Sequence, residues 1–123
     1  MNPVFDKTLK ALEIAGSGRQ LRQNVLASNV ANVETPGYKA KKVDFEDALK
    51  SALHSESSMA LDAGISPDVY DNPEIDVAND GNTVDMEKEM AAMTENNIMF
   101  RAVTQMINKK LAALKYAAND GGR

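Results

Sequence analysis

Apolar residues recur at helical spacing in two long stretches, one toward each end of the chain, with a weakly patterned stretch between them. In the first stretch, residues 1–34, the apolar rows follow steps of three and four, as one face of a helix requires. The first row is Phe5, Leu9 and Leu12, and the second is Leu26, Val30 and Val33. Gly16-Ser17-Gly18 separates the rows, and two glycines inside a helix cost roughly 2 kcal/mol relative to alanine. The pattern leaves open two helices joined by a loop, or one long helix with a soft point.

The stretch 35–82 follows no sustained period. Tyr38 to Val43 favours an extended chain, and Asp44 is predicted to be the N-cap of a short helix. From Ser55 onward Ser, Gly, Pro, Asp and Asn dominate, over about 28 residues, which is long for a loop inside a compact domain. We therefore expect a short helix followed by a functional or disordered loop.

The stretch 83–123 predicts the longest helix, with acidic residues in its first turns and lysines near its end, as the helix dipole favours. Its seam steps alternate four and three over about four heptads, which indicates a coiled coil. The seam residues are Met86, Met90, Met93, Asn97, Phe100, Thr104, Ile107, Leu111 and Leu114. A second row, Met99, Val103 and Met106, widens the apolar face, so this helix needs more than one neighbour.

Together these patterns predict a mainly α protein: long N- and C-terminal helices packed as a coiled-coil-like hairpin, with a short, partly irregular middle region. Ordering such a helix costs backbone entropy at every residue, and burial of one seam offsets this only in part. We therefore expect a lone hairpin to be marginally stable, and other subunits to complete it.

The composition and charge of the chain argue against several classes of function. The net charge of -4 argues against a nucleic-acid binder, and the absence of Cys excludes disulfides, thiolate zinc sites and thiol nucleophiles. His54, the single histidine, stands in a polar stretch with no second catalytic group indicated, so we expect no enzyme, no cofactor and no small-molecule substrate. Asp6, Lys7, Lys10 and Glu13 interrupt any signal-peptide core, so a protein acting outside the cytoplasm would leave without a cleaved signal.

One stretch, Asp76 to Glu87, partly matches a calcium-binding EF-hand loop. It has Asp, Asp, Gly and Glu at positions 1, 5, 6 and 12. Position 3 is Ala78, whose side chain cannot be a ligand, and the preceding segment contains Pro73. We expect no metal here, and a turn at Asp80-Gly81 leading into the second long helix.

The first long helix must stop at Thr35-Pro36-Gly37-Tyr38. Pro36 disfavours helical geometry at Thr35, and Pro-Gly is the preferred central pair of a type II turn, with Gly37 supplying positive φ. Just before it, Ser28, Asn29 and Asn32 form a polar strip beside the apolar row. The strip is either a solvated face or a source of hydrogen bonds to a neighbouring helix or to the turn, and we expect bonds between helices.

The stretch "LASNVANVETPGYKA" resembles the N-terminal signature of the flagellar rod and hook proteins. The matching elements are Asn-X-Ala-Asn and Thr-Pro-Gly-Tyr, carried by Ser28, Asn29, Ala31, Asn32, Thr35, Pro36, Gly37 and Tyr38. "KVDFEDAL" and the run from "DGNTVDMEKEMAAMTEN" into "FRAVTQMINKKLAALKYA" place the resemblance within the basal-body rod proteins. The match covers about residues 20–50 and 80–117.

The resemblance implies a structural subunit of the proximal rod, the drive shaft that crosses the periplasm. It implies export by the flagellar type III apparatus without a cleaved signal, and assembly through the terminal helices. The implied partners are other copies, other rod proteins, the adaptor FliE and the MS ring. Leu26, Val30, Val33 and the seam of the last helix would carry assembly. The alternatives are another rod subunit of the same family, or a soluble helical adaptor that binds a partner helix.

Overall fold

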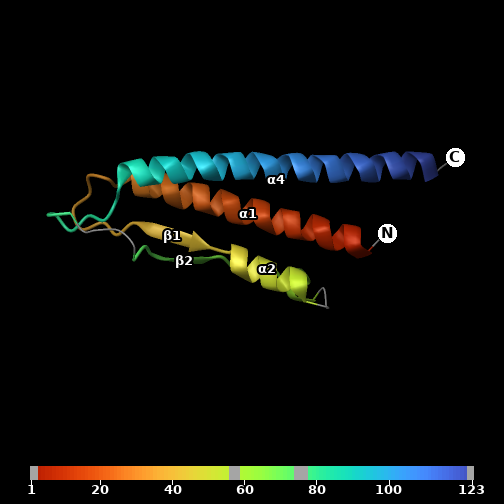
Figure 1. The fold of residues 1–123 in the computed structure, drawn as a ribbon, viewed down its shortest axis with the longest axis horizontal. Helices are drawn as coiled ribbons and strands as arrows, with labels where there is room; N and C mark the ends of the chain where they lie inside the picture. The colour runs from red at the N-terminus through yellow and green to blue at the C-terminus, as the bar shows by residue number, and fades with distance from the viewer. Residues whose placement is uncertain (1–2, 56–58, 74–77, 122–123) are drawn as a thin grey trace.

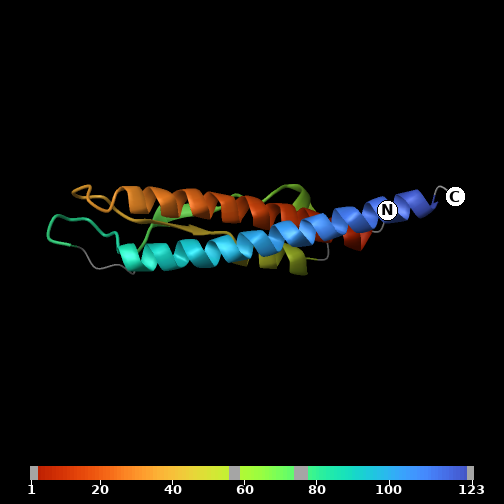
Figure 2. The ribbon, with the colours of Figure 1, turned by 90° about the horizontal axis from the view of Figure 1, so that it is seen from above.

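Two long antiparallel helices dominate the computed structural model, which describes residues 3–55, 59–73 and 78–121. In chain order the elements are α1 (Pro3–Ala31), β1 (Lys41–Asp44), α2 (Glu46–His54), α3 (Met59–Asp62), β2 (Asp68–Asp71) and α4 (Met86–Gly121). In Figure 1, α1 lies between α4 on one side and the strands and α2 on the other, and Figure 2 shows α1 and α4 running side by side. The predicted mainly α hairpin is confirmed.

The first helix is continuous through Gly16-Ser17-Gly18, which settles the choice that the sequence left open. Each glycine lies at a contact with another element. A Cβ on Gly18 would stand 2.7 Å from ring atoms of Phe45, and one on Gly16 would stand 3.6 Å from Cγ1 of Val103. The missing side chain at Gly18 therefore lets the Phe45 ring lie directly on the helix backbone, which explains a residue that otherwise weakens a helix.

This difference between the two glycines predicts opposite effects of alanine. We expect Gly16→Ala to raise the melting temperature, since the new methyl group meets Val103 at an ordinary distance and the helix gains up to about 1 kcal/mol. We expect Gly18→Ala to lower it, because displacing Phe45 costs about 1–3 kcal/mol. Thermal melting followed by circular dichroism checks the pair, and a rise for both variants would contradict the Phe45 contact.

The middle region contains a small antiparallel sheet that the sequence did not predict. Lys41 pairs with Asp71 and Asp44 with Asp68, and α3 precedes β2 in the stretch that shows no hydrophobic period. The stretch that we expected to be a functional or disordered loop thus contains regular structure at these residues. A strand of four residues is too short to show an alternation of apolar and polar residues. The position of β2 is fixed by its pairing with β1.

The predicted N-cap at Asp44 is also wrong. Asp44 is the last residue of β1, and its carboxylate accepts a 2.5 Å hydrogen bond from the Tyr70 hydroxyl of β2. Phe45 takes the N-cap position of α2 and makes no side-chain capping bond. The carboxylate of Asp44 thus bonds to the neighbouring strand instead of capping α2. The sequence around Asp44 does not contain that partner and so could not indicate the bond.

The apolar core lies between α1 and the middle region. Its buried side chains are Ala11, Leu26, Ala40, Val43, Phe45, Ala52 and Leu61. The buried residues of α4 are Glu89 and Asn96, and both are polar. Helix α4 therefore packs on α1 in a different way from the middle region, through polar contacts and half-buried side chains.

Candidate functional site

The turn that ends α1 has the geometry that its sequence predicts. The amide of Tyr38 donates to the carbonyl of Thr35 at 3.2 Å, and Gly37 has φ +74°. A Cβ on Gly37 would meet no atom within 4 Å, so the glycine is required by its backbone angle and not by space. Pro36 fills the first central position of the turn, where its fixed φ is favoured.

Asn82 closes the end of α1 from a distant part of the chain. Its Nδ2 donates to the carbonyls of Asn32, Val33 and Thr35, at 2.9, 3.1 and 2.7 Å. Its Oδ1 accepts the amide of Val84 at 2.7 Å. These carbonyls follow the last turn of α1, where backbone acceptors lack helical partners, so Asn82 caps this end of the helix in the way that a C-cap motif would.

Backbone contacts join the same two segments beside Asn82. Gly37 donates its amide to the carbonyl of Asp80 at 2.9 Å, and Thr83 donates its amide to Tyr38 at 3.0 Å. The Thr83 hydroxyl accepts the amide of Ala40 at 2.8 Å. The turn after α1 and the segment before α4 thus form one hydrogen-bonded unit, which we call the junction (residues 32–41 and 80–84).

Asn29 links the junction to both long helices. Its Nδ2 donates to the carbonyl of Lys41 at 2.9 Å and to Oε2 of Glu89 at 3.0 Å. Its Oδ1 accepts the Lys41 amide at 2.9 Å and the Tyr38 hydroxyl at 3.3 Å. Asn29 is completely buried, and all four of its hydrogen-bonding positions are used. The side-chain amide of Asn29 thus forms two hydrogen bonds with the backbone of Lys41 in β1, as a residue of a neighbouring strand would.

The other polar residues of the signature stabilise the turn itself. Asn32 donates to the Ser28 carbonyl at 2.8 Å and accepts the Thr35 hydroxyl at 3.1 Å. The Ser28 and Tyr38 hydroxyls lie 3.3 Å apart, and Ala31 is the last residue of α1. Asn29 therefore makes the bond between helices that we expected of the strip, whereas the Asn32 side chain bonds within its own segment.

Glu89 is the ionisable residue of this site whose charge is least favoured. Burial raises the pKa of its carboxyl, the hydrogen bond from Asn29 opposes that shift, and nearby Asp85 adds to it. A carboxyl whose pKa is higher in the folded chain binds more protons there, so stability falls as pH rises above the unfolded value of about 4.5. The ionised form of the Glu89 carboxyl is thus less favourable in the folded hairpin than in the unfolded chain.

We therefore expect Glu89→Gln to raise the melting temperature at pH 7 and to flatten its fall as pH rises above about 4.5. Glutamine keeps an oxygen that can accept the Asn29 bond and removes the charge. Glu87→Gln, at an exposed position of the same turn, is the matched control and should leave the slope unchanged. An unchanged slope in Glu89→Gln would contradict the assignment.

A second ionic cluster holds α2 against α1, and its contribution to stability changes over a different range of pH. Arg22 pairs with both oxygens of Glu46 and donates to the Val43 carbonyl at 2.5 Å, and its guanidinium lies 4.9 Å from the centre of the Phe45 ring. The Arg22 hydrogen bond lowers the pKa of Glu46 to about 2. This cluster therefore loses stability only as pH falls from about 4.5 toward 2, below the window of Glu89.

Arg19 completes this cluster one turn earlier. Its guanidinium lies 5.5 Å from the centre of the Phe45 ring and 3.7 Å from Glu46. Burial, and after it the repulsion of Arg22, lower its pKa. Its other contacts are to α4, so one side chain spans α2 and both long helices.

The two long helices meet along a row beside the predicted seam. Glu89 lies opposite Asn29, and Val103 opposite Gly16. Between these contacts, Asn96 donates to the Arg19 carbonyl at 2.8 Å and to Oε1 of Gln23 at 3.1 Å. Periodicity missed this row because Glu89 and Asn96 are polar, although these residues and Val103 are spaced seven apart.

The structure divides the predicted seam residues into two groups. Leu26 is buried, and Val30, Val33, Met93, Ile107 and Leu114 are half-buried. The remaining members are exposed: Met86, Met90, Asn97, Phe100, Thr104 and Leu111. Contact between α1 and α4 within one chain thus leaves most of the α4 seam facing solvent.

Within the described ranges, no group of three His, Cys, Asp or Glu side chains could hold a metal ion. Asp76, the first position of the EF-hand-like stretch, lies outside those ranges. None of the described helices is long and apolar enough to cross a bilayer.

The hairpin has a hydrogen-bonded junction at its closed end and a row of apolar side chains that faces outward. This arrangement defines a helical subunit suited to assembly. Comparison with known proteins shows to which family the subunit belongs. A family model, flagella basal body rod protein, matches residues 9–39, which hold most of α1 and the turn. The flagellar basal body rod protein FlgB of Aeromonas hydrophila is 35% identical, over 89% of this chain and 91% of that protein.

Two further relatives carry the same name. FlgB of Bacillus subtilis is 30% identical over 96% of this chain and 98% of the relative, and FlgB of Salmonella typhimurium is 27% identical over 95% and 96%. The chain belongs to the FlgB family of flagellar basal body rod proteins. It is a structural subunit of the proximal rod and not an enzyme, it resides in the flagellar basal body, and it associates with other rod components.

Proposed function

We propose that the chain builds the drive shaft through its two long helices, with the exposed seam of α4 as its main contact to neighbouring subunits. The segments 1–34 and 83–123 carry assembly, and 35–82 forms the layer on α1. The seam residues that serve this role are Leu26, Val30 and Val33 of the first segment, and Met86, Met90, Met93, Asn97, Phe100, Thr104, Ile107, Leu111 and Leu114 of α4.

One observation carries this proposal: several large apolar side chains of the α4 seam stay exposed in the hairpin of their own chain. Met86, Met90, Phe100 and Leu111 are all exposed, and the buried residues of α4 are Glu89 and Asn96. A 36-residue helix gains little from so polar a contact with α1. Burial of the exposed row by neighbouring subunits would supply the missing stabilisation, at about 25 cal/mol for each Å² of apolar surface.

We further propose its route and its neighbours. The chain leaves the cell by the flagellar type III export apparatus without a cleaved signal peptide, a route that membership of the FlgB family supports. In the basal body it contacts other copies, the adaptor FliE and the MS ring, and it transmits torque along helices that run side by side. Membership of the FlgB family supports these partners.

Leu111→Asp tests the seam. Leu111 is 47% exposed in the free chain, so a carboxylate there leaves the hairpin intact but becomes a buried charge in an assembled rod. We expect the variant to be secreted and to fail to restore motility in a deletion strain. Ala112→Asp, an exposed neighbour off the seam, should restore it. Functional rods built from Leu111→Asp would refute the seam.

Deletion of the coding sequence tests the function itself. The proposal predicts cells without complete basal bodies, in which the intact chain restores both rods and swimming. Motile deletion cells with complete basal bodies would show that the chain does not build the rod.

A further inference from the structure

Strand β2 forms the outer edge of the small sheet, and only one of its two sides is paired. In Figure 1, β1 lies between β2 and α1, and no third strand pairs with β2 within the described ranges. The side of β1 that faces α1 is occupied by side chains of that helix. The Lys41 amide and carbonyl bond to the Asn29 side chain. Arg22 donates to the Val43 carbonyl, so the edge of the sheet that remains open is that of β2.

The register of the sheet shows which backbone groups of β2 face this open edge. Along an antiparallel strand, the amide and carbonyl of successive residues point alternately to one side and to the other. Lys41 and Val43 direct theirs toward α1, so their partners Asp71 and Val69 direct theirs away from β1. No hydrogen bond to these outward groups is formed among the residues that the structure describes. The open edge thus offers two amides and two carbonyls to an added strand.

Two prolines limit the length of the open edge. Pro67 lies two residues before Val69, and Pro73 lies two residues after Asp71. Both therefore face the same edge, and neither has an N–H group to donate. Prolines at such positions keep an edge strand from pairing without limit. The edge accepts a strand of about four residues, the length of β2 itself, so side-chain contacts must add to the affinity.

Two like charges stand opposite each other at one end of the sheet. Asp44 of β1 is the direct partner of Asp68 of β2, and like charges in such a pair are destabilising. The Tyr70 hydroxyl donates to Asp44, but neither carboxylate forms an ion pair in the described part of the chain. A lysine or arginine on an added strand, placed opposite Asp68, would relieve this repulsion.

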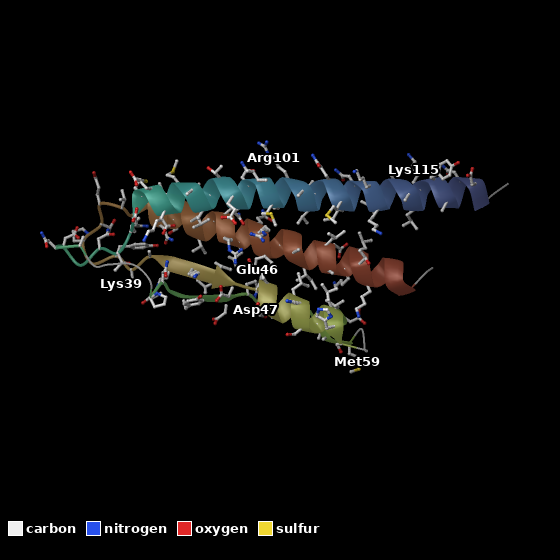
Figure 3. All side chains as sticks on the ribbon, viewed as in Figure 1. Lys39, Glu46, Asp47, Met59, Arg101 and Lys115 are labelled. Carbon is white, nitrogen blue, oxygen red and sulfur yellow. The ribbon has the colours of Figure 1, made fainter. Side chains whose placement is uncertain are left out.

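The charge of the whole middle region favours the same kind of partner. Residues 44–80 contain ten acidic residues and one lysine, whereas the rest of the chain contains 13 basic and eight acidic residues. In Figure 3 the labelled basic side chains of α4, Arg101 and Lys115, project from the far side of the hairpin, away from α1. The open edge of β2 therefore lies in the acidic part of the chain.

We propose that the outer edge of β2 binds a short, extended, basic segment of another protein as a third strand. Main-chain hydrogen bonds to Val69 and Asp71 hold the segment. Its basic side chain lies opposite Asp68, and the apolar side chain next to it meets Val69, which is 45% exposed. A second copy is disfavoured, because two β2 strands side by side would gather four carboxylates. The site lies across α1 from the α4 seam and goes beyond the assembly role of the long helices.

Hydrogen exchange of the intact chain tests the proposal. The probe is a synthetic peptide of residues 39–45 with Asp44→Lys, because this sequence already pairs with β2 in the chain and the change leaves it no acidic residue. Exchange is followed by mass spectrometry at a chain concentration at which the helical signal is maximal. We expect saturating peptide to slow exchange of segment 68–72 several-fold and to leave segment 41–44 unchanged, since β1 keeps its place.

Two control peptides separate strand pairing from charge. N-methylation at Lys42 and Val43 keeps the charge but blocks both edges of the peptide. Glutamate at all its lysine positions keeps the edges but reverses the charge. Neither control should slow exchange. Equal protection by either one would overturn the proposal, and so would faster exchange of segment 41–44, which would show that the peptide displaces β1.

Variants of the chain locate the contact. Val69→Pro removes an outward N–H and leaves the bonds between β1 and β2 in place, so it should abolish the protection. Asp68→Asn keeps the strand and removes one charge, so the peptide should bind several-fold more weakly. Asp62→Asn, at an exposed position of α3, is the matched control and should bind as the unaltered chain does. Undiminished protection in either of the first two variants, or a slowing confined to segment 68–72 that depends on chain concentration and needs no peptide, would contradict the proposal.

Discussion

Asn29→Asp is expected to destabilise the hairpin by about 3–5 kcal/mol, enough to remove most of its helical signal at 25 °C. The change is nearly isosteric, but it replaces the Nδ2 donor by an acceptor facing the Lys41 carbonyl and the Glu89 carboxylate. A completely buried position would then hold a second carboxylate beside Glu89. Circular dichroism and thermal melting at one fixed chain concentration measure the loss.

Two further variants identify the cause. Asn24→Asp makes the same change at an exposed position of α1 and should shift the melting temperature only slightly. Glu89→Gln in the Asn29→Asp background removes the like charge and should recover part of the loss. If Asn29→Asp melts like the unaltered chain, or if Glu89→Gln recovers nothing, the buried contact between the helices is misassigned.

Asn82→Ala is expected to cost about 2–4 kcal/mol, because three carbonyls after α1 lose the Nδ2 donor and the Val84 amide loses its acceptor. The Asn32 and Thr35 carbonyls keep one backbone donor each, the amides of Thr35 and Tyr38. Water can satisfy some of these groups, which sets the lower end of the range. The loss should appear first as faster hydrogen exchange at the Tyr38 and Thr83 amides, since the junction holds both. Exchange is read by mass spectrometry of peptides from the two segments.

Asn79→Ala is the matched control for Asn82→Ala, because Asn79 is an exposed residue of the same loop. It should leave both exchange and melting unchanged. Equal exchange in the Asn82→Ala and Asn79→Ala chains would show that the side chain of Asn82 does not hold the junction together.

Local signals were sufficient to predict the two long helices and the turn. The helices follow from apolar spacing, and the turn from Pro36-Gly37, where the φ of Gly37 is positive as expected. The junction depends on contacts that no local window contains, since Asn82 bonds to carbonyls about 50 residues earlier in the chain. Sheet β1–β2 was missed for the same reason, because each strand is defined by its partner.

The contact between the long helices shows a different limit. Periodicity selects apolar residues, so it identified the α4 row that begins at Met86 and passed over Glu89 and Asn96. Within one chain the polar pair is buried, and most of the apolar row is exposed. A pattern can show that a face needs burial, but not whether the same chain or another provides it.

The central claim is that α4 depends on neighbouring subunits for its stability. Far-UV circular dichroism of the isolated chain during thermal melting, over a wide range of chain concentrations, tests it most directly. We predict that dilute chains melt broadly with incomplete helicity, and that helicity and melting temperature rise with concentration. A dilute monomer with full helicity and a sharp melting transition that does not change with concentration would contradict the claim.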